Sequence, residues 1–367
     1  MHVIITGTRG IPAAHGGFET FAQDLSLFLV SLGHSVTVYC QKDCESRPGE
    51  EMWRGVRLVN IPAGRGTWGT IEFDYKCMRR AVREKGVILT LGYNTGLFSL
   101  FSRLYGVPNV MNMDGIEWKR KKWSLIARGW LLFNEWIGSR LATHLIADHP
   151  AIAQHLQRHT KLSKITVIPY GAEAVVSAPV DLISQFGLFP KDYYILIARP
   201  EPENSILEIV LAASAMGLNH RLVVLGNYAS AERAQTYQQI VLKAASENVR
   251  FLGAIYEPDT VRALRFYAKG YVHGHQVGGT NPSLVESLAM GKAIFAHDNP
   301  FNRWVAGTGA QYFRGTGSLI EALQQADNNP ELLQNMEYAS RKRHSEEFQQ
   351  EVVLGSYLKL LLRIAKA

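Results

Sequence analysis

Residues Tyr271–Lys292, YVHGHQVGGTNPSLVESLAMGK, decide the fold that we expect for the whole chain. The first three residues of this stretch are typical of the end of a buried strand, and glycines at 274, 278 and 279 predict a loop after it. Asn281 and Pro282 then begin a helix, which Gly291 ends. A glycine loop before a helix leaves backbone N–H groups unpaired at the positive end of the helix dipole, which suits a phosphate or diphosphate. The same order also fits an ordinary strand–loop–helix turn, and the rest of the chain has to decide between the two.

Glu286 lies about one turn inside this predicted helix. A carboxylate there weakens an anion site because it repels the anion. It is compatible with such a site if it has a task of its own, such as accepting hydrogen bonds from a pair of sugar hydroxyl groups. Glu286 is therefore a candidate for binding a sugar or a ribose.

Length and composition indicate a folded protein with two domains. A chain of 367 residues is too long for one comfortable core, and 47% hydrophobic with 19% charged residues is typical of soluble globular proteins. No apolar run reaches the length that spans a membrane, so we expect neither a signal peptide nor a transmembrane helix.

The cysteines indicate the cellular compartment, and the net charge indicates the class of partner. Cys40, Cys44 and Cys77 cannot all pair and show no zinc-binding spacing with histidine, so we expect reduced thiols in a cytosolic protein. The net charge of +7 favours an anionic partner, and a nucleotide, a nucleic acid and an acidic lipid surface all remain open on that ground.

The chain begins with a βαβ pattern. An apolar run at residues 2–6, HVIIT, leads into a glycine-containing loop, an amphipathic helix over 18–32 and a strand over 36–39. The loop is not GxGxxG, and the second strand ends in Gln41 where a nicotinamide-binding fold needs an acidic residue for the ribose. Both features count against a nicotinamide-dependent enzyme.

Strand and helix patterns alternate along the rest of the chain, and a looser stretch after Tyr170 is interpreted as a linker. We expect further strands at residues 56–61, 87–91, 109–113, 143–147, 165–168, 194–198, 221–225, 249–252, 271–273 and 293–296. The main helices are expected at residues 75–85, 97–105, 118–141, 151–158, 205–216, 232–245, 259–267, 282–290 and 345–364.

This order predicts an α/β protein with two doubly wound, Rossmann-like domains that face one another across a cleft. The expected domains are residues 1–172 and residues 173–367, with the last helix returning toward the first domain. The loops at 8–17, 114–117, 198–204 and 274–283 all follow strands, so all of them are able to face the cleft.

Several motifs together resemble one family. The N-terminal loop has Gly16, Gly17 and Glu19 before a helix that ends in GHSVTV, the domain junction has VIPYGAE at 167–173, and the helix after the glycine loop lies in GGTNPSLVESLAMGKAIFA at 278–296. This layout resembles the retaining GT-B glycosyltransferases of family 4 over nearly the whole chain. The resemblance implies that residues 1–172 bind the acceptor and residues 173–367 bind the nucleotide-sugar donor. MDGIEWKRKKW at 113–123 and ARPEPEN at 198–204 are most similar to the branch with bacterial rhamnosyltransferases of capsule and O-antigen assembly.

The resemblance implies residue roles, with three departures from the family pattern. Glu286 falls on the second Glu of the family's E-x7-E pattern, which binds the nucleotide ribose, but Gly278 stands where the first Glu belongs. Arg199 matches the Arg of an R-x4-K phosphate clamp, but Asn204 replaces the Lys. Asp114 replaces a His often found at that strand end. The resemblance leaves the second cation to Arg9, Lys292 or backbone N–H groups. We expect catalytic roles for Arg199 and Asp114, donor binding by Gly16, Gly17, Arg199, Asn204, His275, Gly279, Thr280, Asn281, Ser283 and Glu286, acceptor binding by Arg9, Asp114 and Glu117, and no metal.

Each of these residues also has an ordinary structural explanation. Gly16 and Gly17 fit a tight turn, and Arg199 fits a surface arginine. Asp114 before Gly115 fits an Asx turn. His273 and His275 fit core or loop residues better than catalytic bases.

The basic tract Lys119–Lys122 is interleaved with tryptophans at 118, 123, 130 and 136. A charge run is usually a solvated helix face. With the tryptophans and the following LIARGWLLF as an apolar partner face, the tract also fits a helix that lies on anionic lipid.

These observations favour a retaining, metal-independent glycosyltransferase of hexosyltransferase type. We expect it to move a sugar, rhamnose by the closest resemblance, from a nucleoside diphosphate to a lipid-linked glycan in cell-surface polysaccharide synthesis. No cofactor is expected besides the nucleotide-sugar co-substrate, nucleic acid is not expected as a partner, and the place of action is the cytoplasmic face of the membrane. The resemblance implies front-face displacement, in which the leaving phosphate helps to deprotonate the acceptor. A sugar-nucleotide epimerase or hydrolase on the same scaffold, and a non-catalytic nucleotide-sugar or glycan-binding protein, are the alternatives.

Overall fold

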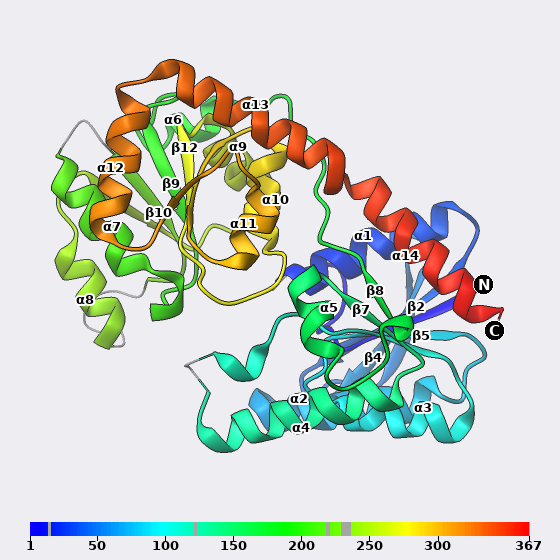
Figure 1. Cartoon of the computed structure of the whole chain (residues 1–367). Helices are drawn as coiled ribbons and strands as arrows, with labels where there is room; N and C mark the ends of the chain where they lie inside the picture. The colour runs from blue at the N-terminus through cyan, green and yellow to red at the C-terminus, as the bar shows by residue number, and fades with distance from the viewer. Residues whose placement is uncertain (14–15, 121–122, 218–220, 229–235, 367) are drawn as a thin grey trace. The chain divides into compact units, whose positions relative to one another are not determined.

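The computed structural model describes residues 1–13, 16–120, 123–217, 221–228 and 236–366 (Figure 1). The chain divides into two compact units. The first unit is Met1–Pro169 together with Val352–Ala367, and the second is Tyr170–Glu351. The division after Pro169 lies just before the boundary expected at 172–173, and the closing residues belong to the first unit.

The first unit is built on one sheet, for which the described residues supply eight strands in the order β3-β4-β2-β1-β5-β6-β7-β8. The strands are β1 (His2–Thr6), β2 (Ser35–Lys42), β3 (Gly49–Trp53), β4 (Val56–Pro62), β5 (Val87–Leu91), β6 (Asn109–Asn112), β7 (His144–Ala147) and β8 (Ile165–Val167). All neighbouring strands are parallel except β3 and β4. Every residue of β5, β6 and β7 is buried, as expected for a parallel sheet that helices cover on both faces.

Helices cover both faces of this sheet. They are α1 (Gly17–Ser31), α2 (Gly66–Ala81), α3 (Ser99–Tyr105), α4 (Leu125–Leu141), α5 (Pro150–Leu156) and the greater part of α14 (Gln350–Ala365), with short 3-10 turns η1 (Gly96–Phe98), η2 (Glu117–Lys119) and η3 (Leu162–Lys164). The helices α2, α3 and α4 lie along one face, and α1 and α14 lie along the other (Figure 1). Tyr357 on α14 packs its ring 4.7 Å from that of Phe21 on α1 and accepts a 2.8 Å hydrogen bond from Asn112 at the end of β6.

The second unit has a parallel sheet in the order β11-β10-β9-β12-β13-β14. Its strands are β9 (Tyr193–Ile197), β10 (Arg221–Leu225), β11 (Val249–Gly253), β12 (Gly270–His273), β13 (Ala293–His297) and β14 (Gln311–Phe313). The helices are α6 (Asp181–Ser184), α7 (Ile206–Met216), α8 (Thr236–Ala244), α9 (Pro258–Tyr267), α10 (Pro282–Ala289), α11 (Pro300–Ala306), α12 (Thr316–Asp327) and α13 (Pro330–Glu347), with η4 (Pro202–Asn204). Alternate residues of β9 enter two cores: Tyr194 and Leu196 face the helices α7 and α12, whereas Tyr193 and Ile195 face α9 and α10.

Several expected elements differ from the observed ones. The long helix predicted over 118–141 is wrong: η2 ends in extended backbone at Arg120, and α4 begins only after Ser124, whose hydroxyl caps it by accepting from the N–H of Ala127 at 3.3 Å. Residues 121–122 of that range, and 232–235 of the helix expected over 232–245, lie outside the described residues. The helix expected from residue 75 begins at Gly66, and the strands β3 and β14 were not predicted.

The fold class is confirmed: both units are doubly wound α/β sheets. In each sheet the strand order reverses beside the strand that opens the unit, between β1 and β5 in the first unit and between β9 and β12 in the second. In open α/β sheets ligands bind outside the carboxyl ends of the strands at such a switch point. The loops after these four strands are therefore the places to look for a site.

Candidate functional site

Two loops meet at the switch point of the second unit. The Arg199 loop (residues 198–205) follows β9, and the glycine loop (residues 274–281) follows β12. Gln276 ties them together: its backbone N–H donates to Glu203 O at 2.9 Å, and its side-chain amide donates to Ser205 Oγ at 2.9 Å. A Cβ on Gly274 would lie only 2.1 Å from the carbonyl oxygen of Asn204, so glycine is needed for this close approach.

Arg199 is the exposed cation of this pair of loops. Within the described ranges its guanidinium has no ion-pair partner. Asn204 is buried, and its side-chain amide donates to the carbonyl oxygen of Arg199 at 2.9 Å. Asn204 therefore fixes the shape of the loop, and it adds no charge beside Arg199.

The glycine loop leads into α10, as the sequence predicts. Asn281 caps the helix by accepting from the N–H of Ser283 at 3.0 Å, and Pro282 occupies the first turn. Thr280 is buried, while Gly279 is half-buried. Gly278, which stands where the resembling family has a Glu, has φ 154° and nothing near its Cβ position. A side chain at residue 278 would have space but would strain the backbone.

Glu286 is held by a residue that the sequence analysis missed, Arg265 on α9. The Arg265 guanidinium is 2.7 Å from Glu286 Oε2 and donates to Ser283 Oγ at 3.2 Å. Arg265 is 4% exposed, whereas the Glu286 side chain is 43% exposed, so one buried cation orients a carboxylate that still reaches solvent. The signal in the sequence was an arginine among the buried residues of an amphipathic helix, which requires an anionic partner.

Tyr271 and His273 form a buried polar row behind this helix start. The Tyr271 hydroxyl donates to Ser283 Oγ at 2.9 Å, and burial raises the pKa of Tyr271 to about 12, so it stays a neutral donor. Burial, followed by the neighbouring His275 and His297, lowers the pKa of His273 well below its usual value. The His273 ring stacks on His275 with centroids 4.5 Å apart. His273 is therefore a neutral core residue, and His275 lies half-buried in the glycine loop.

Lys292 is engaged elsewhere. Its ammonium group is buried and donates to the carbonyl oxygens of Phe266 and Ala268 at 2.6 and 3.1 Å, near the C-terminal end of α9. Burial lowers the pKa of Lys292 to about 8. Of the two cations considered beside Arg199, Lys292 is thus committed to the fold.

In the first unit, Glu19 organises the loop after β1. Its carboxylate accepts from the N–H of Arg9 at 3.3 Å and lies 3.1 Å from the Cβ position of Gly16. Gly17 begins α1, so Glu19 sits in the first turn of the helix. This contact gives the GG-x-E pattern a physical reason, although residues 14 and 15 lie outside the described part of the loop.

Asp114 and Glu117 follow β6 in the same unit. Asp114 has φ 49°, an uncommon conformation for a residue with a side chain, and its N–H donates to Asn112 Oδ1 at 2.9 Å. The side chain that caps this turn is therefore that of Asn112. Glu117 is paired with Arg120 at 2.7 Å, so its charge is balanced locally.

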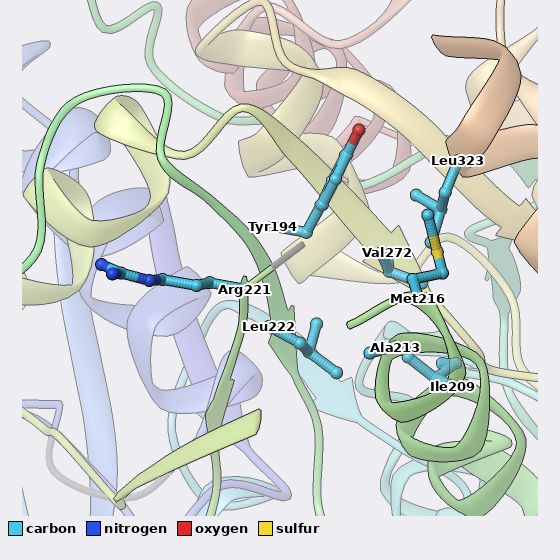
Figure 2. A pocket seen from close by; sticks show the side chains of 8 residues that line it. All are labelled: Tyr194, Ile209, Ala213, Met216, Arg221, Leu222, Val272 and Leu323. Atoms are coloured by element: carbon cyan, nitrogen blue, oxygen red, sulfur yellow. The ribbon is translucent and has the colours of Figure 1, made fainter. Parts of the chain in front are cut away.

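A pocket in the second unit lies in the core and not at the loops (Figure 2). It is lined by Tyr194, Ile209, Ala213, Met216, Arg221, Leu222, Val272 and Leu323. Its volume is about 10 Å³, close to the least that holds one water molecule. It is a gap in core packing, with no room for a sugar or a nucleotide.

Two protein-family models match the chain. Residues 1–173 match a domain of unknown function, DUF1972, and residues 183–343 match the family described as glycosyl transferases group 1. No curated protein matches the chain. The second match covers all the residues of the Arg199 loop, the glycine loop and α10.

Solved structures share the fold across both units. Sucrose-phosphate synthase from Thermosynechococcus elongatus superposes with a TM-score of 0.81 at 16% identity, over 99% of this chain and 98% of that one. HepE from Anabaena in complex with UDP-glucose has a TM-score of 0.76 at 13% identity, over 99% of each chain. A glycosyltransferase from Rickettsia africae ESF-5 has a TM-score of 0.74 at 12% identity, over 100% and 98%. The chain therefore has the GT-B fold, and residues 183–343 of its second unit match the glycosyl transferases group 1 model.

Proposed function

We propose that this chain, with a GT-B fold and a glycosyl transferases group 1 domain, is a retaining glycosyltransferase that uses a nucleoside-diphosphate sugar. One observation carries the proposal: the exposed Arg199 and the N-terminus of α10 belong to two loops joined at a topological switch point. An exposed guanidinium and the positive end of a helix dipole both attract the negative charge of a diphosphate.

The donor is proposed to bind with its diphosphate at these loops and its ribose at Glu286. Arg265 holds one carboxylate oxygen of Glu286, and the half-exposed side chain leaves the other to accept from a pair of ribose hydroxyl groups. HepE, which has the same fold, has been solved with UDP and with UDP-glucose. This supports a nucleoside-diphosphate sugar as the co-substrate, with no other cofactor.

Catalysis is proposed to rest on positioning and on stabilisation of the leaving charge. In a front-face displacement the bond between the anomeric carbon and the diphosphate oxygen breaks, and the acceptor oxygen bonds to that carbon on the same face. The leaving phosphate oxygen takes the proton of the acceptor hydroxyl. Arg199 and the N–H groups around Thr280 then stabilise the diphosphate, without a metal ion on it. Lys292 is engaged in the fold, so it does not supply a second cation at the diphosphate.

The acceptor is proposed to be a lipid-linked glycan at the cytoplasmic face of a membrane. The exposed side of α4 supports this, because five large apolar residues share it: Leu125, Ile126, Leu132, Phe133 and Trp136, exposed by 83%, 88%, 41%, 43% and 40%. Their spacing places them on one face, and Arg140 lies over the Trp136 ring at 4.2 Å. An apolar helix face flanked by cations is the pattern of helices that lie on anionic lipid.

We assign the proposed membrane surface to α4 and not to the basic tract. Arg120 is paired with Glu117, Lys121 and Lys122 lie outside the described residues, and Lys119 remains exposed before the helix. No helix in the described part of the chain has both the length and the apolar composition to cross a bilayer. Rhamnose transfer and a role in cell-surface polysaccharide synthesis rest on the motifs MDGIEWKRKKW and ARPEPEN alone.

A labelled-donor assay tests the proposal. Thermal shift with a panel of UDP- and dTDP-sugars, nucleotide-rhamnose included, identifies the donor, and that donor is then incubated with a lipid-diphosphate-linked glycan. Transfer with the anomeric configuration of the donor kept, measured by NMR, is the expected result. Release of free or epimerised sugar would make the chain a hydrolase or an epimerase. Tight binding without turnover, with a range of acceptors, would make it a binding protein.

A further inference from the structure

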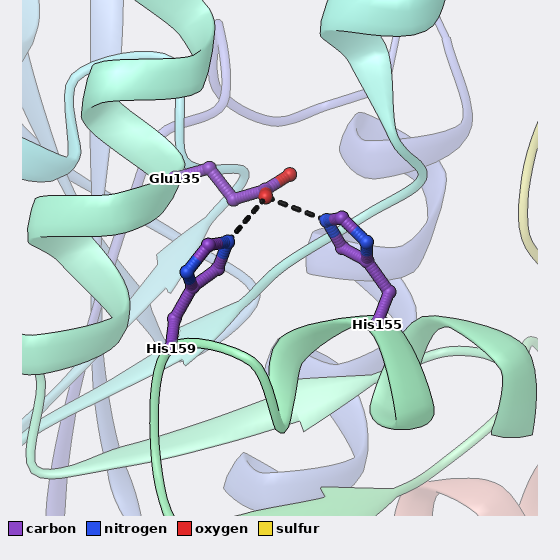
Figure 3. Close-up of side chains that lie close together, drawn as sticks. All are labelled: Glu135, His155 and His159. Carbon is purple, nitrogen blue, oxygen red and sulfur yellow. Dashed lines mark hydrogen bonds and ion pairs between the residues drawn. The ribbon is translucent and has the colours of Figure 1, made fainter.

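Glu135, His155 and His159 form a cluster inside the first unit (Figure 3). Glu135 is on the buried side of α4, His155 is on α5, and His159 is in the turn that follows α5. The Nε2 atoms of His155 and His159 lie 2.7 and 3.3 Å from the same oxygen, Oε1 of Glu135. The exposed fractions of the three side chains are only 2%, 10% and 18%.

Hydrogen bonds inside the protein leave this cluster incomplete. His155 Nε2 is within hydrogen-bond distance of Glu135. The Nε2 atom of His159 is buried and has no hydrogen-bond partner among the described residues, although it faces the same carboxylate oxygen. A buried nitrogen without a hydrogen-bond partner is costly to the fold, and a cation bound by this nitrogen and the carboxylate would offset that cost.

The three atoms have the spacing of metal ligands. They lie within 4.8 Å of one another, and zinc bonds of about 2.0–2.1 Å in a tetrahedron place ligand atoms about 3.4 Å apart. Small side-chain rotations would bring the observed distances of 2.7 and 3.3 Å, from the two histidine Nε2 atoms to Glu135 Oε1, to that value. The two histidines are separated by three residues, HLQRH, a spacing found in metal-binding histidine pairs.

Trp118 prepares the carboxylate for such a role. Its indole N–H donates to Glu135 Oε2 at 3.0 Å, which fixes the carboxylate and leaves Oε1 toward both histidines. An outer hydrogen bond that orients a ligand is typical of metal sites. Trp118 thus acts as a positioning residue.

We propose that Glu135, His155 and His159 bind one divalent transition-metal ion, Zn²⁺ in the first instance, with solvent in the fourth position. Two imidazoles and one carboxylate suit Zn²⁺, whereas Mg²⁺ and Ca²⁺ prefer oxygen ligands alone. The ion joins α4 to α5 and holds the Trp118 segment against both. It is separate from the proposed diphosphate chemistry, because the group 1 domain lies wholly in the second unit.

Metal content of the full chain tests this proposal without an activity assay. Tag-free protein is stripped with a chelator, dialysed against excess ZnCl₂, gel-filtered and analysed by elemental mass spectrometry. One zinc per chain is expected, and calorimetric titration with ZnCl₂ should give a stoichiometry of one. Glu135→Gln and His159→Asn should each weaken zinc binding at least tenfold. Trp118→Phe removes the hydrogen bond that orients Glu135, and this should weaken zinc binding about tenfold or more. His34→Asn, at the turn after α1, is the matched control and should bind like the wild type.

Three results would overturn the proposal: wild-type protein that retains no zinc, Glu135→Gln protein that binds as tightly as the wild type, or His34→Asn protein that loses the ion equally. Melting temperatures in chelator establish whether each variant is folded. If Glu135→Gln fails to fold, the more exposed His159→Asn carries the test. If the cluster is only an ion pair, each substitution will lower the melting temperature by the same amount in chelator as in zinc.

Discussion

Arg265 shows how one buried cation determines what a neighbouring carboxylate is able to do. Near a helix start Glu286 would repel an anion, but the guanidinium 2.7 Å away balances that charge. The same contact fixes the carboxylate and leaves it partly exposed. Charge balance and ribose recognition are therefore compatible at the proposed diphosphate site.

Glu286→Gln should weaken UDP binding by about 2 kcal/mol, or about thirtyfold, because an amide is a poorer acceptor for a hydroxyl pair than a carboxylate. Gln is preferable to Ala here, since its amide oxygen still accepts from Arg265, whereas Ala would leave that buried guanidinium without an acceptor at this position. Calorimetric titration with UDP and with 2′,3′-dideoxy-UDP checks the reason. The variant should lose affinity for UDP only, and equal losses for both ligands would remove the ribose from Glu286.

Arg199→Lys should retain the fold and lose most of the transfer activity. A lysine keeps the charge but cannot reproduce the bidentate grip of a guanidinium on phosphate oxygens, and Asn204 offers no second charge. Turnover with the labelled donor is measured beside the melting temperature. Arg262→Lys on the surface of α9 is the control, and a wild-type rate in Arg199→Lys would mean that Arg199 does not hold the leaving group.

His144 on β7 should make the fold sensitive to mild acid. Burial, then Arg363 and Lys164, lowers the pKa of His144 to about 4, against about 6.5 in an unfolded chain. Between these values the unfolded state binds the extra proton, so the free energy of unfolding falls as the pH drops from about 6.5 to 4, by up to about 3 kcal/mol. Urea unfolding of wild type and His144→Gln at pH 7 and pH 5 measures this. The variant should show a smaller difference between the two pH values, while His34→Gln should behave like the wild type.

At the scale of an element, the two sides of α4 carry residues with different roles. Its inner side carries Glu135 and the packing against the sheet, and its outer side carries the apolar row from Leu125 to Trp136. An ordinary surface helix has polar residues on its outer side. The composition of α4 thus supports an outer partner that is itself apolar, and Lys119 in η2 before the helix and Arg140 in its last turn favour an anionic one.

Replacing Leu125, Ile126 and Trp136 with Ser should release the protein from vesicles that contain phosphatidylserine. Lys119→Gln with Arg140→Gln should weaken the same binding by about 2 kcal/mol at moderate salt, and more salt should remove that difference. Sedimentation with phosphatidylserine and with phosphatidylcholine vesicles measures both effects. Met52→Ser and Tyr256→Ser, at exposed apolar residues elsewhere, are controls. Wild-type protein that stays in the supernatant at low salt would contradict the membrane proposal.

The elements that periodicity identifies are those with buried apolar cores, and the sequence predicts most of them closely. It fails where the cause is not local hydrophobicity. The edge strand β3, GEEMW, is charged and exposed and is recognisable only through its pairing with β4. Glycines in α2 indicate a loop, yet a Cβ at Gly69 would lie 1.8 Å from Gly64 O, so this glycine serves close packing.

The sequence predicts the candidate site residues that follow a strand directly or lie near the start of a helix. Arg199, Asn281 and Glu286 follow strands or start helices, and their positions are read from the pattern. Arg265 was missed because its partner is distant in sequence. The same holds for His155 and His159, which become a cluster only when α4 brings Glu135 beside them.

At the scale of the whole molecule, most of the last helix belongs to the first unit, although it follows the second unit in the sequence. Gln350 and Glu351 belong to the second unit, whereas α14 from Val352 onward belongs to the first. The chain therefore leaves the first unit after Pro169 and returns to complete it. Tyr357 is buried on this helix and contacts both Asn112 and Phe21 of the first unit.

Tyr357→Ala should destabilise the first unit by about 3–5 kcal/mol, because it empties a buried aromatic site and leaves Asn112 without its partner. All tryptophans except Trp304 lie in the first unit, so tryptophan fluorescence in urea reports mainly on it. UDP titration in low urea reports on the second unit and should be unchanged. Val352→Ala, an exposed position on the same helix, is the control, and an equal loss in both variants would contradict this role for Tyr357.

The return of α14 has a consequence for biosynthesis. A ribosome that has released residue 169 has delivered every strand of the first sheet, yet the surface beside Phe21 and Asn112 stays bare until residue 357 emerges. The second unit has to be translated in between, so the first cannot mature in the usual order, one domain after another. Nascent chains interrupted inside the second unit would display that bare apolar surface to chaperones and proteases. The helix α14 therefore packs on the first unit only after both units have been translated.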